Sequence, residues 1–475
     1  MTTEKRSIGF TEGKIFPRLL LFVLPIVATN LLQTLYHAAD MIVVSLSDQA
    51  NAVGAIGTTG SFINLVVNIF IGFSVGTNVT VARSIGAGDR EGAQKAVHTS
   101  LIMALMFGVL GSALGLLISR PVLTAMGNTG SLLDLAVRYT YIYFCGVPFL
   151  AITNYLIAIF RAKGDAKTPL VVLAAAGLLN VLLNLFFVVI VGLSVEGVAL
   201  ATMISNVASF VVLIFKLWKD KDYTTFSPKK LRIDKTAFRN IIYIGLPAGI
   251  QGALFSLSNM LIQSSVVTVN NNVCPPESDY QPIVNGSAAA ANIEGFVYTS
   301  MNAVYQASIT FTSQNVGAKK LERVKPILYN CYLLTTLIGL IMSASVFLFR
   351  VPLLSLYGIT AGEAGSLEEL AMQTATTRFW YITLPYFLCG LMEVGSGVLR
   401  GLGKSLLSTS IALVGSCLLR VVWLLTVFPL YPTLEVIFVC YPITWFMTAA
   451  TSFTVIHILM GKIRKRKYAN EKNPT

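Results

Sequence analysis

The sequence predicts an all-α integral membrane protein in which twelve transmembrane helices form two six-helix lobes. Three observations lead to this prediction: an apolar composition, twelve long apolar stretches, and a repeat of the first half of the chain in the second. Of the 475 residues, 55% are hydrophobic and 12% are charged, whereas a soluble domain has about 25% charged residues. A soluble protein with so little charge would expose large apolar patches. The composition therefore excludes a cytosolic enzyme, a disordered chain and a nucleic-acid-binding protein.

Twelve apolar stretches are each long enough to cross a bilayer, whose hydrocarbon core of about 30 Å needs roughly 20 residues per helix. They are predicted at residues 17–46, 52–82, 94–118, 136–160, 169–191, 196–217, 238–269, 287–313, 326–349, 372–398, 406–428 and 435–460. The first stretch is too long for the apolar core of a signal peptide and no A-x-A site follows it, so we expect it to remain as a helix.

The basic residues predict which side each loop faces, because cytoplasmic loops of membrane proteins are enriched in Lys and Arg. If the N-terminus is placed inside, 30 of the 35 basic residues fall in the predicted cytoplasmic segments. The outer side then has only Arg120, Arg138, Arg350 and Arg378, and Arg420 falls within a span. We therefore expect a multi-pass protein of the cell membrane with cytoplasmic N- and C-termini.

The second half of the chain repeats features of the first half. Leu24 and Pro25 in the first span match Leu246 and Pro247 in the seventh. Two loops also match, 85–91 with 316–322 and 161–165 with 400–404. Because each repeat has six spans, both halves point the same way, and we expect two lobes related by a pseudo-two-fold axis along the membrane normal. The expected parts are an N-lobe at 1–217, a cytoplasmic linker at 218–237, a C-lobe at 238–460 and a basic cytoplasmic tail at 461–475.

An ionisable side chain inside a span costs about 2.5–3.5 kcal/mol on insertion scales, which makes each one a candidate functional residue. Asp40 in the first span is the leading candidate. It shares one helical face with Gln33, Tyr36 and His37. A polar stripe of this kind is expected to line a cavity or to meet polar partners. A carboxylate there suits a proton or a Na⁺ ion, and the alternative is an Asp that is hydrogen-bonded for helix packing.

Other spans carry polar side chains that we expect to line the same kind of cavity. In the first half they are Asn64 and Asn68 of the second span, Asn154 of the fourth, and Asn180 and Asn184 of the fifth. In the second half they are Gln263 of the seventh span, Glu294, Tyr298 and Met301 of the eighth, and Glu393 of the tenth. Tyr298 and Met301 follow Glu294 at helical spacing and form a face suited to an adaptable apolar ligand. Core packing is the alternative interpretation of that face.

The sequence carries no motif for several other kinds of chemistry. No group of His, Cys and Asp has the spacing of a metal site, and no nucleophile and base are spaced for an intramembrane enzyme. The string 401–405 is not a phosphate loop, because Val398 stands where that motif requires its first glycine. We therefore expect no cofactor and no nucleic-acid partner. Active transport by this chain would have to be driven by an ion gradient.

Six strings in order resemble the MATE (multidrug and toxic compound extrusion) family over residues 15–460. The strings are Gln33–Asp40, Ile85–Asp89, Arg161–Pro169, Leu179–Asn180, Glu196–Thr202 and Leu399–Gly403. The resemblance implies a monomeric antiporter of a bacterial inner membrane with two six-helix lobes and a central cleft. It implies export of drugs and other organic, often cationic compounds in exchange for H⁺ or Na⁺.

Positions that match the family motifs suggest roles for individual residues. The ion-coupling residues implied are Asp40, Asn154, Asn180, Asn184, Thr202 and Glu393. The expected substrate-binding residues are Gln33, Tyr36, His37, Asn64, Asn68, Gln263, Glu294, Tyr298 and Met301.

The sequence departs from the family pattern at two places. Many members have Asp where this chain has Asn184, and members with a Na⁺ site in the C-lobe carry an acid in the seventh span, which here has none. Asp40 is therefore the expected coupling group, and the choice between H⁺ and Na⁺ stays open. The alternative function is that of a flippase for lipid-linked precursors, because proteins of a related fold do that work. Its cavity should contain several basic residues, but only Arg420 is predicted near mid-membrane.

Overall fold

The computed structural model describes residues 9–44, 47, 52–220, 222–274, 281–363 and 365–472, without the side chains of Val53, Ser61 and residues 466–472. The end of the predicted first span, at residues 45 and 46, and the basic residues Lys5 and Arg6 lie outside this part of the chain. Every element among the described residues is helical. The predicted all-α fold is therefore confirmed.

The helices of the first half coincide with the first six predicted spans, and most extend beyond them. They are α1 (Ile15–Val44), α2 (Ala52–Gly86), α3 (Arg90–Ala125), α4 (Gly130–Ala162), α5 (Lys167–Leu185) with the π-helical turn η1 (Phe186–Ile190), and α6 (Val195–Lys219). A short 3₁₀ turn, η2 (Pro228–Lys230), lies in the predicted linker.

The second half has the other six predicted spans, of which two are interrupted by π-helical turns. Its elements are α7 (Lys235–Val273), α8 (Pro282–Gly317), η3 (Leu321–Arg323), α9 (Val324–Leu348), α10 (Arg350–Ser355), α11 (Leu367–Arg378), η4 (Phe379–Thr383), η5 (Leu384–Tyr386), α12 (Phe387–Gly401), α13 (Ser405–Ala412), η6 (Leu413–Leu418), α14 (Leu419–Thr426) and α15 (Leu434–Lys472). The tenth predicted span therefore consists of α11, η4, η5 and α12, and the eleventh of α13, η6 and α14.

Eleven helical stretches in the described part of the chain are long and apolar enough to cross a membrane. The eighth predicted span, α8, is not one of them. It has 36 residues, but Asn, Gln, Ser and Thr recur along it. A helix with polar side chains at membrane depth needs protein or water on its polar side. All twelve predicted segments are thus helices, and α8 differs from the others in its polarity.

The chain divides into two compact units, Met1–Ala253 with Ser313–Lys320, and Leu254–Thr312 with Leu321–Thr475. The division lies inside α7 and near the end of α8, whereas the sequence suggested a division in the linker 218–237. Close packing of α7 on α2 explains the difference. Gly249 of α7 lies against Gly72 of α2, and a Cβ on Gly76 would overlap the Ile241 carbonyl. Small residues of this kind let two helix backbones approach closely.

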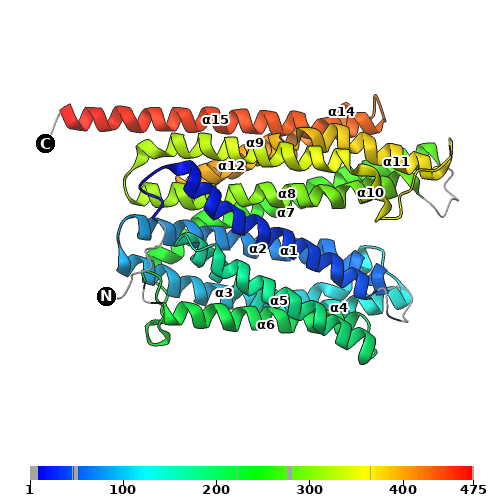
Figure 1. The fold of residues 1–475 in the computed structure, drawn as a ribbon, viewed down its shortest axis with the longest axis horizontal. Helices are drawn as coiled ribbons and strands as arrows, with labels where there is room; N and C mark the ends of the chain where they lie inside the picture. The colour runs from blue at the N-terminus through cyan, green and yellow to red at the C-terminus, as the bar shows by residue number, and fades with distance from the viewer. Residues whose placement is uncertain are drawn as a thin grey trace. The chain divides into compact units, whose positions relative to one another are not determined.

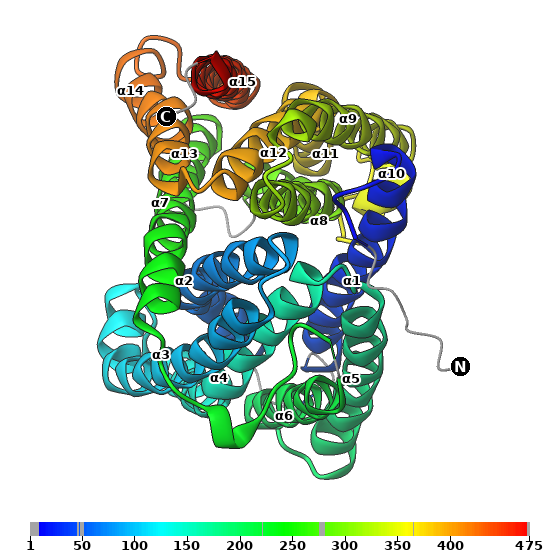
Figure 2. The same cartoon turned by 90° about the vertical axis from the view of Figure 1, so that its left-hand side faces the viewer.

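The helices of the first unit run side by side along one direction (Figure 1). Figure 2 shows α4 in the middle of this unit, and α4 packs against α2, α3 and α6. Tyr155 and Phe160 of α4 share an apolar cluster with Val97 of α3 and Leu213 of α6. In the second unit α12 packs against α9 and α15. In the first unit α6 packs in turn against α5, and α5 against α1, which positions the helices that carry Asp40, Asn180 and Thr202.

The matching loops of the two halves have the same backbone conformation. Gly88 after α2 has a φ of 71°, and Lys319 at the matching position after α8 has a φ of 58°. In both turns the N–H of this residue donates to the carbonyl three residues earlier, at 3.0 and 3.1 Å. Gly164 and Gly403 form a second matching pair, with φ values of 88° and 77°. The repeat seen in the sequence is therefore present in the conformation of these loops.

The ends of α2 and α8 touch through two matching glycines. A Cβ on Gly86 would overlap the Gln314 backbone, and a Cβ on Gly317 would overlap the Arg83 carbonyl. Gly86 matches Gly317 in the sequence repeat, and Arg83 matches Gln314. The contact is therefore reciprocal: each repeat contributes the same glycine and the same backbone surface.

Candidate functional site

Polar side chains connect three helices of the first unit. Asn184 of α5 donates from Nδ2 to Oδ1 of Asp40 on α1 at 2.5 Å and to Oδ1 of Asn180 at 3.3 Å. Asn180 donates in turn to the hydroxyl of Thr202 on α6 at 3.4 Å. We call these four residues the polar chain. It brings together four of the six residues expected to couple an ion.

The polar chain forms because Asn180 and Asn184 are one turn apart and so lie on one face of α5. Asn184 is completely buried and Asn180 is 7% exposed. Since buried amides need hydrogen-bond partners, this face of α5 has to meet polar groups on its neighbours. Asp40 and Thr202 are those groups.

Tyr36 closes the side of the site between α1 and α5. Its hydroxyl donates to the carbonyl of Ala174 at 3.1 Å. Its ring occupies the space that a Cβ on Gly177 would need. Gly177 therefore permits the close contact of α1 with α5 that places Asp40 beside Asn184.

The other neighbours of Asp40 are an imidazole and two phenol rings. Nδ1 of His37 lies 4.0 Å from Oδ2 of Asp40, with the His37 side chain 81% exposed and that of Asp40 14% exposed. Tyr139 and Tyr143 of α4 pack in one apolar cluster with Val43, at the end of α1, and both lie within electrostatic range of Asp40. The carboxylate thus lies between a polar chain, an aromatic wall and an exposed histidine.

The chemistry available to the site follows from its donors and acceptors. Asp40 when ionised only accepts hydrogen bonds, whereas its protonated form also donates one. Oδ1 of Asn184 is buried and accepts no hydrogen bond in the described part of the chain. An acceptor without a partner beside a carboxylate suits either a proton donor or a hard cation. Among the described residues, no group of three or more His, Cys, Asp or Glu side chains could hold a metal ion.

The other candidate site residues of the first unit are not members of the polar chain. Asn154 is half-buried and donates to the Leu150 carbonyl of its own helix at 3.0 Å. Gln33 and Asn64 are exposed. Asn68 is half-buried, and its side chain lies against Gly252 of α7.

In the second unit, Glu294 of α8 forms a buried ion pair. Arg378 donates to its Oε2 from Nε at 3.1 Å and from Nη2 at 2.9 Å. Thr383 donates to Oε1 at 3.0 Å, and Arg378 also donates to Ser287 at 3.0 Å. Both carboxylate oxygens of Glu294 therefore have partners within the protein.

The partner of Glu294 is a residue that the sequence assigns to the outer side of the membrane. Arg378 is 8% exposed, and its guanidinium lies 5.5 Å from the centre of the Phe438 ring. Its position inside the predicted span 372–398 was the signal that could have indicated burial. Glu294 supplies the opposite charge for the buried guanidinium of Arg378.

The other candidates of the second unit differ in exposure. Tyr298 is 36% exposed, whereas Met301 is 2% exposed and packs in an apolar cluster. For Met301 the structure therefore agrees with the core-packing interpretation. Glu393 is half-buried and forms no ion pair in the described part of the chain, although Arg400 and the two tyrosines 298 and 305 lie within electrostatic range. Gln263 is half-buried on α7.

Arg420 of α14 is another buried arginine in the spans of this unit, as is Arg400 of α12, which is 4% exposed. It is 3% exposed, and Nε donates to Thr444 at 3.1 Å. Its guanidinium lies 4.2 Å from the centre of the Tyr441 ring and 5.8 Å from that of Trp445. Stacking on aromatic rings compensates part of the charge of a buried cation. Sequence reasoning placed Arg420 in a span but did not identify these partners.

The family model described as MatE matches residues 25–186 and 281–426. The chain belongs to this family. The matched residues include three members of the polar chain, Asp40, Asn180 and Asn184, and the Glu294–Arg378 pair. The family matched is the one suggested by the motif strings in the sequence.

Two curated relatives of this MatE chain span most of its length. The chain is 26% identical over 425 residues to the probable multidrug resistance protein YoeA of Bacillus subtilis, covering 87% of this chain and 86% of the relative. It is 22% identical over 397 residues to the probable multidrug resistance protein NorM of Thermotoga maritima, covering 82% and 80%.

Solved structures share the fold of this MatE chain. A multidrug resistance MATE family transporter of the MOP superfamily in an outward-facing conformation gives a TM-score of 0.87 at 21% identity, covering 98% of this chain and 100% of the other. A MOP superfamily transporter from Pyrococcus furiosus gives 0.88 at 21% identity with the same coverage. The predicted multi-pass membrane fold is therefore confirmed.

Proposed function

We propose that this MatE chain is a secondary active antiporter, not an enzyme, which exports organic and often cationic compounds in exchange for H⁺ or Na⁺. The observation that carries the proposal is the polar chain, in which a carboxylate within a membrane span is hydrogen-bonded to a second helix and through it to a third. The names of the relatives from B. subtilis and T. maritima, both multidrug resistance proteins, support the substrate class.

In the proposed mechanism Asp40 is the coupling group. While Asp40 is charged, the amide of Asn184 donates to both Asp40 and Asn180. Protonation gives the Asp40 carboxyl a donor of its own, and Oδ1 of Asn184 is the free acceptor beside it. Turning the Asn184 amide to accept this proton removes its N–H from Asn180. The hydrogen bonds that join α1, α5 and α6 then rearrange.

A Na⁺ ion would act on the same atoms in a different way. Carboxylate, amide and hydroxyl oxygens are ligands for hard cations, and Asp40, Asn184 and Thr202 present one of each. The ion would draw the Asn184 oxygen toward Asp40 and displace the same N–H. Either ion therefore changes the packing of the three helices.

Coupling to export requires that the ion and the substrate each bind two conformations of the protein with different affinities. We propose that substrate entering from the cytoplasm favours the charged form of Asp40, and that neutralisation of Asp40 favours release outside. Gln33 and His37 are exposed on the face of α1 that carries Asp40 and are proposed to contact the substrate. In the second unit we propose this role for Tyr298 and Gln263, with Glu393 as a second ionisable group.

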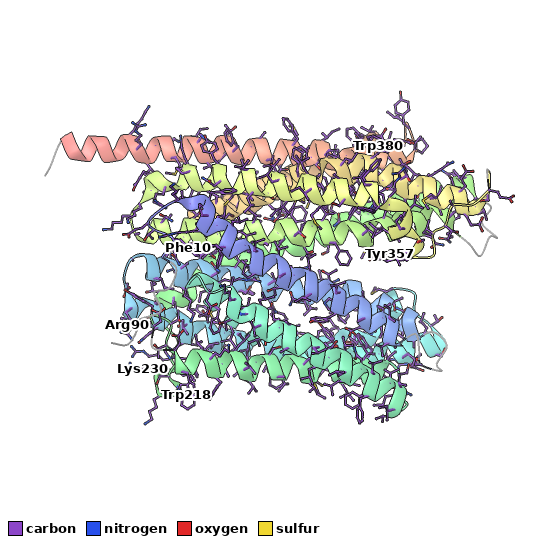
Figure 3. All side chains as sticks on the ribbon, viewed as in Figure 1. Phe10, Arg90, Trp218, Lys230, Tyr357 and Trp380 are labelled. Atoms are coloured by element: carbon purple, nitrogen blue, oxygen red, sulfur yellow. The ribbon has the colours of Figure 1, made fainter. Side chains whose placement is uncertain are left out.

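We also propose that both termini are cytoplasmic and that the protein acts as a monomer in a bacterial inner membrane. The distribution of basic residues supports this orientation. Figure 3 labels Arg90 and Lys230, which lie at the same end of the first unit. Both belong to segments predicted to be cytoplasmic by their content of Lys and Arg.

The experiment that tests the coupling role uses the full chain in proteoliposomes loaded with the fluorescent cation ethidium. A pH gradient and a Na⁺ gradient are imposed separately, and the gradient that drives export by the wild type identifies the ion. Asp40→Asn keeps the size of the side chain and removes its charge. We expect its gradient-driven export to fall to the rate of protein-free liposomes.

Asp134→Asn is the matched control, because Asp134 lies at the start of α4, its side chain is 55% exposed, and its partner is Arg120 at 3.3 Å. We expect this variant to export at the wild-type rate. Export by Asp40→Asn at the wild-type rate, under the gradient that drives the wild type, would show that Asp40 is not the coupling group.

A further inference from the structure

The first half of α7 has two faces of different chemistry. Ala237, Ile241 and Ile244 are at most 6% exposed and face the interior of the first unit, where α7 lies beside α2 (Figure 2). The opposite face begins with Lys235 and Arg239, both exposed. An amphipathic helix of this kind buries one face and leaves the other to the surroundings.

The exposed face carries a cleft with a volume of about 450 Å³. It is lined by Lys235, Thr236, Arg239, Asn240 and Tyr243. Two cations and three neutral hydrogen-bond donors therefore line one open hollow. An anionic oxygen group is the ligand that this set of side chains would recognise.

The two cations of the cleft have no acidic partner among the residues that the structure describes. Neither Lys235 nor Arg239 forms an ion pair in the described part of the chain. The carboxylate nearest in sequence, Asp234, accepts a hydrogen bond from the backbone of Ala237 at 2.9 Å and so caps the start of α7. The net charge of the cleft lining is positive.

Beyond the cleft, the same face becomes aromatic and then apolar. Tyr243 is 56% exposed, followed one and two turns later by Leu246 at 43% and Ile250 at 45%. Arg239 and Lys235 lie about 6 and 12 Å along the helix from Tyr243. The polar region of one leaflet is about 5–8 Å deep, so with Tyr243 at the hydrocarbon boundary Arg239 lies among the headgroups and Lys235 just beyond them. Tyrosine is enriched at that boundary. The order of cation, tyrosine and aliphatic residue matches the order of headgroup, interface and acyl chain in a bilayer.

The length of α7 allows the cleft to lie at headgroup depth. With 39 residues, α7 spans about 58 Å, which exceeds the hydrocarbon core of about 30 Å. At least one end of the helix must therefore pass through the headgroup region. Lys235 is the first residue of α7.

We propose that this cleft binds the headgroup phosphate of an anionic membrane phospholipid, whose acyl chains lie along Leu246 and Ile250. Each Lys or Arg near an anionic lipid surface strengthens binding about fivefold. The two basic residues together give about a 25-fold preference over a zwitterionic lipid. The proposal is independent of Asp40 and of ion coupling.

The test is native mass spectrometry of the full chain in detergent with phosphatidylglycerol or phosphatidylcholine added. We expect the wild type to bind one phosphatidylglycerol in preference to phosphatidylcholine. Lys235→Gln/Arg239→Gln should bind phosphatidylglycerol about 25-fold more weakly, and Arg239→Gln alone about fivefold more weakly. Both residues are exposed, so thermal unfolding of the variants should match that of the wild type.

Lys229→Gln/Lys230→Gln is the matched control, because it removes two exposed lysines from η2, outside the cleft. It should bind phosphatidylglycerol as the wild type does. Equal binding by the cleft variant and the wild type would overturn the proposal, as would equal binding of the two lipids. Displacement of phosphatidylglycerol by millimolar glycerol phosphate would show a site for free phosphate esters and would also overturn it.

Discussion

Asn184 on α5 donates a hydrogen bond of 2.5 Å to the carboxylate of Asp40 on α1, 144 residues earlier in the chain. The same amide reaches Asn180. In the proposed mechanism this amide changes its hydrogen bonds when the charge of Asp40 changes, and the change reaches the neighbouring turn of α5. A residue that only filled space between α1 and α5 would have no such effect.

Asn184→Leu should destabilise the protein and uncouple transport. The substitution removes the donor to a charged group, a hydrogen bond of the kind that contributes about 1.5–3 kcal/mol. We expect the free energy of unfolding in detergent to fall by about 2 kcal/mol, and gradient-driven export of ethidium to be lost.

Asn330→Leu serves as the control for Asn184→Leu, because Asn330 is only half-buried and donates within its own helix, to the Pro326 carbonyl at 2.7 Å. Its effect should stay within about 0.5 kcal/mol. If the two variants lost equal free energy of unfolding, the hydrogen bond of Asn184 to Asp40 would contribute no more to stability than a hydrogen bond within one helix.

Gly177→Ala should push α5 away from α1, because the Tyr36 ring occupies the place of the new methyl group. Overpacking of this kind costs about 1–3 kcal/mol. Adding Tyr36→Ala should restore part of the loss, so the two changes are not additive. The measurement is a double-mutant cycle of thermal unfolding. Additive losses would mean that the ring and the glycine do not constrain each other.

Glu294→Gln should destabilise the second unit, since it leaves the buried guanidinium of Arg378 without an opposite charge. Breaking a buried ion pair by removing one partner costs about 3–5 kcal/mol. Glu294→Leu/Arg378→Met removes both charges and should be closer to the wild type in unfolding temperature. If the single and the double variant lost the same amount in unfolding temperature, the charges of Glu294 and Arg378 would not compensate each other.

Lys319→Gly should stabilise the protein. Lys319 has a φ of 58°, and a left-handed conformation costs an L-residue about 1–2 kcal/mol relative to glycine. We expect a gain of about 1 kcal/mol, read from chemical unfolding. Gly88→Lys, at the matching turn, should lose a similar amount. Lys229→Gly is the control, because Lys229 is an exposed lysine without a positive φ; a gain there would show that the backbone angle is not the cause.

The length of the apolar stretches and the distribution of Lys and Arg in the loops between them were sufficient to predict the helices. Where the spans are regular, as in α3 and α6, composition alone determines the element. The sequence also placed Asn180 and Asn184 on one face of α5, because the spacing within a helix is fixed. The partner across the interface, Asp40, depends on how α1 and α5 pack. The family resemblance, and not periodicity, brought these residues into one group.

Three features of the structure could not be predicted from the sequence. The ion pair of Glu294 with Arg378 joins α8 to the end of α11, and nothing in a linear sequence marks an Arg in a span as paired. The π-helical turns η1, η4 and η6 each add one residue to a turn and rotate the later residues of the span by about 100°, and they have no compositional signature. The boundary between the two units lies inside α7 because Gly249 of α7 contacts the backbone of Gly72 on α2. This contact between distant residues cannot be predicted from the sequence of either helix alone.

The contact of Gly86 and Gly317 with Gln314 and Arg83 bears on the ancestry of the chain. When two identical molecules associate about a two-fold axis, each surface meets its own copy. The crossing of α2 with α8 has this property within one polypeptide. A six-helix chain that paired with a second copy of itself about a two-fold axis would make the same crossing. The crossing is therefore the one expected if this chain arose by duplication of a six-helix half.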